Sequence, residues 1–262
     1  MKKEKDRIEK EVSKKFLQKG YYIFDISEKK ILKDIHLLVT KFLQKKLKKK
    51  IKLEQLHSFI QPSELNKIRM ELYSFLNNKK NFVNNYFELG KDILNIICGD
   101  ELVMQRKINL SIQLSFDDSS LLPLHSDVWS GCSPYEVVLW IPLVNCNKTN
   151  SMYILPKSYN DEIYKKFKKY NAVKDVENVI LKKAEFLNIK FGQGLIFQHQ
   201  LLHGNIINKE INSRVSFNCR FKSLFSPYDS TGIGETFKTL KIKPATLFGM
   251  NYNDPKIKKI RF

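Results

Sequence analysis

The chain has 262 residues, 42% hydrophobic and 12% aromatic, which is sufficient for one large domain with a buried core. No run approaches the roughly 18 consecutive apolar residues of a membrane-spanning helix. The charged beginning, MKKEKDRIEK, lacks the apolar stretch of a secretory signal. Cys98, Cys132, Cys146 and Cys219 lack C-x-x-C spacing, which favours reduced thiols in a cytoplasmic protein over disulfides or a zinc cluster.

The net charge is +19, from 46 Lys and Arg against 27 Asp and Glu. Such an excess is typical of proteins that bind nucleic acid or anionic membranes. Here it is mostly lysine spread along the chain. Its densest segment, LQKKLKKKIKL at 43–53, lacks the arginine and aromatic residues of a base-stacking surface. We therefore expect no nucleic-acid partner, whereas an anionic small substrate is compatible with the charge.

The first hundred residues are predicted to be mainly helical. Apolar residues recur there at helical spacing, in segments with plausible starts such as Ser27 and the Pro62–Ser63 pair. The predicted helices cover 4–18, 27–49, 61–78 and 81–99, and a short strand is predicted at 20–26.

Strands dominate after residue 100. Apolar residues alternate strictly with polar ones over 107–116, which predicts a strand with one apolar face. Further strands are predicted around His125 and at 136–144, 151–156, 194–204 and 214–225, with a helical stretch at 158–179. Many short strands without regular strand–helix alternation indicate an antiparallel sandwich or barrel. We therefore expect a mainly β fold with α-helices, a jelly roll carrying N-terminal helices. The single domain would span 1–262, with a helical part at 1–100, a jelly-roll core at 101–230 and an extension at 231–262.

The stretch LPLHSDVWSGC contains His125 and Asp127, two potential metal ligands two residues apart. In an extended strand, side chains at this spacing point to the same face, so they could converge on one ion. A hydrogen-bonded His–Asp pair at a strand end would give the same pattern.

A second histidine cluster, FQHQLLHGN, lies downstream. Two histidines and one carboxylate that leave coordination positions open form the facial triad of non-haem Fe(II) oxygenases. We expect His203 to complete this triad with His125 and Asp127, because the backbone can turn close to a metal at Gly204. His199 is interpreted as a buried structural histidine.

Arg214 follows His203 by eleven residues and could bind a carboxylate of a cosubstrate in such a site. A guanidinium can hold a carboxylate through two parallel hydrogen bonds, and 2-oxoglutarate has a distal carboxylate. Arg214, Ser216, Asn218 and Arg220 would share one face of their strand, although a solvent-facing sheet would show the same pattern.

Taken together, four segments of the chain resemble the phytanoyl-CoA-dioxygenase-like superfamily of Fe(II)/2-oxoglutarate oxygenases. They are LPLHSDVWSGCSPYEVVLWIPL, NSMYILP, LIFQHQLLHGN and RVSFNCRFKSLFSPY. The closest likeness is to the bacterial 2-oxoglutarate oxygenases of sporadically distributed carbohydrate-biosynthesis clusters. The resemblance covers about residues 100–250 and rests on H-x-D followed by a distant histidine and an arginine. It implies a double-stranded β-helix, Fe(II), 2-oxoglutarate and O₂ as cosubstrates, and oxidation, most simply hydroxylation, of a sugar or sugar-derived intermediate.

Carried over to this chain, the resemblance implies that His125, Asp127 and His203 hold iron and that Arg214 holds 2-oxoglutarate. Trp140 matches a tryptophan that lines the cosubstrate pocket, with core packing as the alternative. Gln113 and Ser216 lie on polar strand faces and are candidate cosubstrate contacts. The superfamily often has a serine where this chain has Asn205, so the hydrogen bonding there is left open.

Trp129 and Arg220 are the candidate substrate contacts, because an indole face can stack on a sugar ring. The substrate itself, a sugar-type small molecule for which a phosphorylated or nucleotide-linked form is compatible, cannot be read from the residues, and neither can the oligomeric state. Two alternatives stay open: a basic nucleic-acid-binding or membrane-surface module without catalysis, and a cupin-like metal enzyme or zinc hydrolase that does not use 2-oxoglutarate. Neither alternative requires a carboxylate clamp at Arg214.

Overall fold

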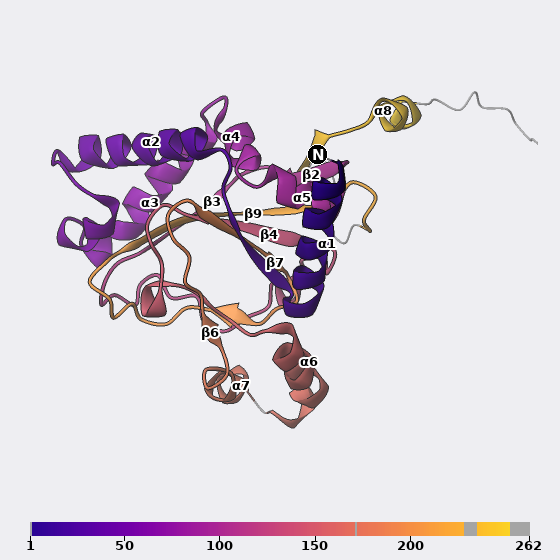
Figure 1. Cartoon of the computed structure of the whole chain (residues 1–262). Helices are drawn as coiled ribbons and strands as arrows, with labels where there is room; N and C mark the ends of the chain where they lie inside the picture. The colour runs from indigo at the N-terminus through magenta and orange to yellow at the C-terminus, as the bar shows by residue number, and fades with distance from the viewer. Residues whose placement is uncertain (1, 171, 228–234, 252–262) are drawn as a thin grey trace, which may run out of the picture.

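The computed structural model describes residues 2–170, 172–227 and 235–251 of the chain (Figure 1). The helices are α1 (Lys2–Lys19), α2 (Lys29–Leu47), α3 (Pro62–Asn77), α4 (Phe82–Glu88), α5 (Lys91–Cys98), α6 (Lys157–Lys166), α7 (Val173–Ile180) and α8 (Pro244–Met250). Single 3-10 turns are η1 (Leu53–Ser58), η2 (Asp127–Ser130), η3 (Lys148–Asn150) and η4 (Phe167–Lys169). The strands are β1 (Tyr21–Asp25), β2 (Leu102–Gln105), β3 (Asn109–Gln113), β4 (Val137–Pro142), β5 (Tyr153–Ile154), β6 (Glu185–Phe186), β7 (Gln193–Gln198), β8 (His203–Gly204), β9 (Arg214–Ser223) and β10 (Phe237–Lys241).

The strands form two antiparallel sheets. The larger has seven strands in the order β1-β7-β4-β9-β2-β10, with β3 also paired to β9, and the smaller has the order β6-β5-β8. Strand β9 is the longest, with ten residues, so its second edge is shared by two partners: β3 pairs with its first half and β2 with its last residues. This places the polar faces of β3 and β9 side by side.

The N-terminal helices cover the outer face of the large sheet (Figure 1). In α2 the buried residues Leu32, Ile35, Val39 and Leu43 recur every three or four positions and form one apolar stripe. Tyr86 of α4 donates a hydrogen bond of 2.7 Å to the carbonyl of Leu139 in β4. These contacts form part of the main hydrophobic core, which extends to Val138 and Phe197 on the opposite face of the sheet, where the functional site lies.

A second apolar cluster joins the small sheet to α6 and α7. It includes Tyr153 of β5, Ile163 of α6, Val176 of α7 and Leu202, all of them buried. The small sheet is therefore packed against helices on its outer side, as the large sheet is. The arrangement is a mainly β, jelly-roll-like fold with helices outside.

Several predicted elements are formed with altered bounds. The helix predicted over 81–99 is two helices, because a Cβ at Gly90 would lie 2.7 Å from the side chain of Leu139 and the chain turns at this close approach. The strand predicted over 194–204 is interrupted between β7 and β8. The strand predicted around His125 is wrong: an isolated bridge at His125 is followed directly by η2. β2, β10 and α8 were not predicted from the sequence.

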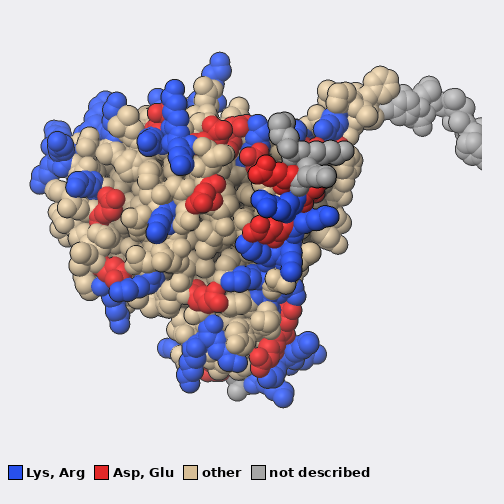
Figure 2. Space-filling model, in the orientation of Figure 1, with Lys and Arg blue, Asp and Glu red and all other residues tan. Residues whose placement is uncertain are grey.

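Lysine and arginine side chains are scattered over the face seen in Figure 2 and alternate with acidic side chains. No helix in the described part of the chain has the length and apolar character needed to cross a membrane.

Candidate functional site

His125 and His203 lie side by side because their backbones form an antiparallel bridge, which joins the segment before η2 to strand β8. The amide of each residue donates a 3.0 Å hydrogen bond to the carbonyl of the other. Their ring centroids are 4.2 Å apart. The bridge thus joins histidines that are 78 positions apart in the sequence.

Asp127 begins η2, two residues after His125. One ligand atom from each of His125, Asp127 and His203 lies within 4.8 Å of the others, a spacing that can hold one metal ion. The structure therefore brings together the three predicted ligands, although a bridge and a turn achieve this rather than a strand.

The ring orientation of both histidines is fixed in the same way. Nδ1 of His125 lies 2.8 Å from the carbonyl of Pro123, and Nδ1 of His203 lies 2.8 Å from the carbonyl of Leu201. A carbonyl can only accept, so Nδ1 carries the proton and Nε2 presents a lone pair. Burial lowers the pKa of His203 to about 4, which keeps that ring neutral and able to bind a metal.

The Asp127 carboxylate is held ionised by its surroundings. Arg220 donates a 3.0 Å hydrogen bond from Nη2 to Oδ1 of Asp127. Burial opposes ionisation, but the electrostatic attraction of neighbouring groups, among them the permanently charged Arg220 guanidinium, outweighs it, so the pKa of Asp127 is below its ordinary value. Oδ2 faces the ring of His203, whose Nε2 is 3.9 Å away.

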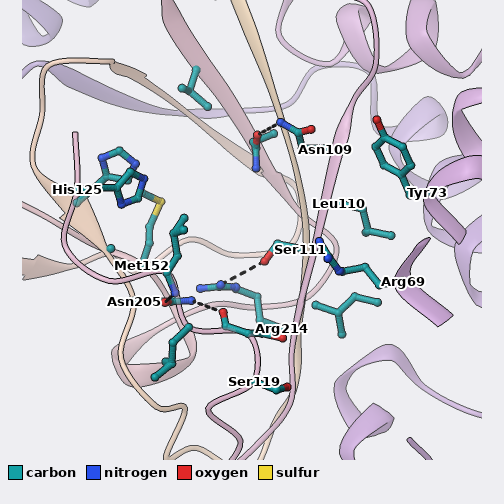
Figure 3. A pocket seen from close by; sticks show the side chains of 18 of the residues that line it. Arg69, Tyr73, Asn109, Leu110, Ser111, Ser119, His125, Met152, Asn205 and Arg214 are labelled. Atoms are coloured by element: carbon teal, nitrogen blue, oxygen red, sulfur yellow. Dashed lines mark hydrogen bonds between the residues drawn. The ribbon is translucent and has the colours of Figure 1, made fainter. Parts of the chain in front are cut away.

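These residues open into a cavity of about 750 Å³ between the inner face of the sheets and helix α3. Its lining mixes apolar with polar side chains and includes three arginines, Arg69, Arg214 and Arg220, with Asp127 as the acidic member. In Figure 3, His125 and Arg69 lie on opposite sides of the cavity, and Arg214 lies between Asn205 and Ser111. The volume suits a small-molecule ligand.

Arg214 is the least satisfied charge in the cavity. Its side chain is 4% exposed, and its one hydrogen bond is from Nη2 to Oγ of Ser111, at 3.5 Å. Nε and Nη1 have no partner, and neither does Oγ of the neighbouring Ser216. None of the ion pairs found among the described residues involves Arg214. A buried guanidinium without a carboxylate is costly, so this arrangement fits an anion that enters the cavity.

Gln113 faces Arg214 across the β3–β9 pair and is fully buried. Its Nε2 donates a 2.7 Å hydrogen bond to the carbonyl of Ile206, which leaves only Oε1, an acceptor, without a partner. An acceptor suits the Arg214 guanidinium better than it suits an anionic ligand.

The two tryptophans and Arg220 are placed as follows. Trp140 lies on the inner face of β4 opposite Asn218, is buried in the main core, and is not among the residues that line the cavity. Trp129 packs edge-on against Phe167, with ring centroids 5.3 Å apart, and also lies outside the lining. Arg220 lines the cavity but is paired with Asp127. Roles for these residues at the cosubstrate or substrate remain predictions.

Three polar cavity residues on α3 were not singled out from the sequence. These residues are Asn66, Arg69 and Tyr73, whose spacing of three and four positions places them on one face of α3. They line the side of the cavity opposite the histidines. Arg69 donates a 2.7 Å hydrogen bond to Asn66. All three flank the apolar stripe of α3, as the solvent-facing polar residues of that helix also do, so the sequence did not distinguish them.

Asn205 occupies the position where the resemblance leads one to expect serine. Its Oδ1 accepts a 2.6 Å hydrogen bond from the amide of Leu122, and its Nδ2 donates to the carbonyl of Ser120 at 3.4 Å. Asn205 thus ties the 120–122 loop to the β8 end of the cavity.

Comparison with known proteins supports the fold. No protein-family model matches the chain, and no curated protein matches it significantly. Among solved structures, the non-heme alpha ketoglutarate dependent carbocyclase SnoK from nogalamycin biosynthesis is 12% identical, covers 88% of this chain and 96% of its own, and has a TM-score of 0.53. EctD from S. alaskensis in its apoform is 14% identical, covers 84% of this chain and 80% of its own, and has a TM-score of 0.54. At such low identity the likeness concerns the fold alone: the chain shares its mainly β, jelly-roll-like architecture with SnoK and EctD.

Proposed function

We propose that the chain is an Fe(II)/2-oxoglutarate-dependent oxygenase that oxidises a small, sugar-type molecule, most simply by hydroxylation. One observation carries the proposal. The His125–Asp127–His203 cluster and a buried Arg214 with two unpartnered nitrogens open into the same cavity. Neither feature alone distinguishes this activity, but a metal site combined with a carboxylate clamp does.

The two imidazoles and the carboxylate fit the preferences of Fe(II). They offer two neutral nitrogens and one anionic oxygen from one side, which leaves the other coordination positions open. Iron, when bound, would supply the oxidising chemistry of O₂ together with 2-oxoglutarate. The protein's own part is to fix the ligands: Pro123 and Leu201 orient the two rings, and Arg220 orients Asp127.

Arg214 would bind the distal carboxylate of 2-oxoglutarate through Nε and Nη1, with Ser216 as an additional donor. Gln113 would align the guanidinium through Oε1 instead of contacting the diacid. A second EctD structure, solved with 2-oxoglutarate and 5-hydroxyectoine, lends support from the same fold, at 13% identity and a TM-score of 0.53, over 80% of this chain and 74% of that chain.

The far side of the cavity would bind the substrate. Asn66, Arg69 and Tyr73 place amide, guanidinium and hydroxyl groups there beside apolar side chains, which suits a polyhydroxylated molecule. No carboxylate of the described residues pairs with Arg69, so a substrate with an anionic group, such as a sugar phosphate or nucleotide-linked sugar, fits best. The positions of Trp129 and Trp140, outside the cavity lining, do not support a role for either residue in binding the substrate or the cosubstrate. We further propose that 1–262 is one oxygenase domain with a double-stranded β-helix core at 101–230.

The test is an anaerobic titration of the protein with Fe(II) and 2-oxoglutarate, followed through the weak visible charge-transfer band of the ternary complex. We expect the band in the wild type and in His36→Gln, because His36 lies against Phe191, away from the cavity. His203→Ala should lose the band together with Fe(II) binding, and Arg214→Met should lose it at moderate 2-oxoglutarate while retaining Fe(II). Metal binding that is indifferent to 2-oxoglutarate in the wild type would contradict the proposal and favour a cupin-like enzyme.

A further inference from the structure

A second cluster of potential metal ligands lies behind Asp127. Cys132 and Glu136 belong to the loop between η2 and β4, and His199 follows β7. One ligand atom from each of the three lies within 4.8 Å of the others. We propose that this cluster binds a thiophilic divalent cation of the zinc class, separate from the metal held by His125, Asp127 and His203. The proposal does not depend on the oxygenase activity.

His199 points to a missing ligand. The residue is fully buried, and neither of its ring nitrogens has a hydrogen-bond partner. Nδ1 lies 3.4 Å from Oε2 of Glu136, yet the two atoms do not form a hydrogen bond. Leaving a buried polar nitrogen unsatisfied is destabilising. Two ligands about 2.0–2.1 Å from a tetrahedral zinc ion are about 3.3 Å apart, close to the spacing of these two atoms.

The ligand types match this class of cation. Thiolate, imidazole and carboxylate are the groups that bind zinc, and Cys132, His199 and Glu136 supply one of each.

The neighbouring charge is compatible with a cation. Lys222 is fully buried and its Nζ lies 3.3 Å from Oε1 of Glu136, so this ion pair uses the carboxylate oxygen that faces away from His199. Oε2 remains on the side of the cluster. The Glu136 carboxylate and a Cys132 thiolate carry two negative charges against the one positive charge of Lys222, so a divalent cation requires Cys132 as the thiolate.

A cation bound at this cluster would help to orient Asp127, a ligand of the proposed iron site. Nε2 of His199 lies 3.9 Å from Oδ2 of Asp127. With Nδ1 bound to a cation, the ring would carry its proton on Nε2 and direct it toward that carboxylate. The cation would also join the loop that carries Asp127 to the end of β7.

Cobalt(II) titration of the metal-free full-length protein tests the proposal, because cobalt bound to a thiolate gives an intense near-ultraviolet charge-transfer band. We expect two equivalents to bind per chain and the thiolate band to accompany one of them. Cys132→Ser should bind one equivalent without the band, and Cys98→Ser, a half-buried cysteine outside the cluster, should behave as the wild type.

Two further variants separate this site from the first one. His203→Ala should lose one equivalent but retain the thiolate band, whereas His199→Gln should lose the band. Circular dichroism should show that each variant is folded. A wild type that shows no thiolate band, or whose band survives in Cys132→Ser, would overturn the proposal. Saturation at one equivalent that carries the band would support this cluster and count against the site at His125, Asp127 and His203.

Discussion

Replacing Arg214 by methionine should change the stability and the ligand affinity of the protein in opposite directions. Arg214 is 4% exposed, and its guanidinium has two nitrogens without partners and one hydrogen bond of 3.5 Å, to Ser111. Burial lowers its pKa, which reflects how poorly the charge is solvated. Methionine has a similar length but no charge. In the metal-free and ligand-free protein the substitution therefore removes the cost of burying an unpaired charge and removes no strong favourable interaction.

The magnitudes follow from the two states of the site. Replacing buried charged groups by apolar ones of similar volume is often stabilising, by about 1–4 kcal/mol, so the free energy of unfolding of Arg214→Met should rise within that range. In the presence of 2-oxoglutarate, the wild type gains two charge-assisted hydrogen bonds of about 1.5–3 kcal/mol each. The variant should therefore bind 2-oxoglutarate about 10²- to 10⁴-fold more weakly.

Urea denaturation without ligand and calorimetric titration of 2-oxoglutarate in the presence of Fe(II), both anaerobic, measure the two quantities. Ser111→Ala is the matched control: it removes the long hydrogen bond and should alter each quantity by less than about 1 kcal/mol. A variant that is less stable than the wild type and binds 2-oxoglutarate equally well would refute the reasoning.

Three further predictions concern the same cavity. Burial lowers the pKa of His203 to about 4 and that of His199 to about 3, so between about pH 6.5 and 4 the unfolded chain binds more protons than the folded one. The unfolding free energy of the metal-free protein should thus fall by a few kcal/mol as the pH drops through this window, and a flat urea-denaturation profile would contradict it. Gly204→Ala should destabilise the protein by about 1–3 kcal/mol and weaken Fe(II) binding, because the added Cβ would lie 2.6 Å from Oη of Tyr153; unchanged melting and metal titrations would argue against this. Arg69→Gln should raise the KM for a phosphorylated sugar by about tenfold to a hundredfold and leave that for its neutral parent unchanged, whereas equal effects on both would exclude an anion contact.

The elements most accessible from the sequence were those with a strong local pattern. The strict alternation over 107–116 predicted β3, and the stripe of Leu32, Ile35, Val39 and Leu43 predicted α2. Short elements such as β2, β8 and β10 were missed or misplaced because two to five residues have too little periodicity to identify them.

The sequence by itself determined which chemical groups are present: an H-x-D pair, a histidine followed by glycine, and an arginine on the polar face of a strand. These residue types and spacings restrict the chemistry before any coordinates are known. The tertiary structure decided how they meet. His125 reaches His203 through a two-hydrogen-bond bridge, and Asp127 reaches both from a 3-10 turn, neither of which leaves a periodic trace in the sequence.

Only tertiary packing decided which polar side chains are buried and which of them have hydrogen-bond or ion-pair partners. The loop between η2 and β4 brings Cys132 and Glu136 close to His199, although the spacing of the cysteines gives no sign of it. Helix α3 likewise brings Arg69 to the cavity from forty residues before β3. Whether a charged side chain is solvated, paired or left without a partner depends on neighbours that are distant in the chain. A local pattern carries no information about those neighbours.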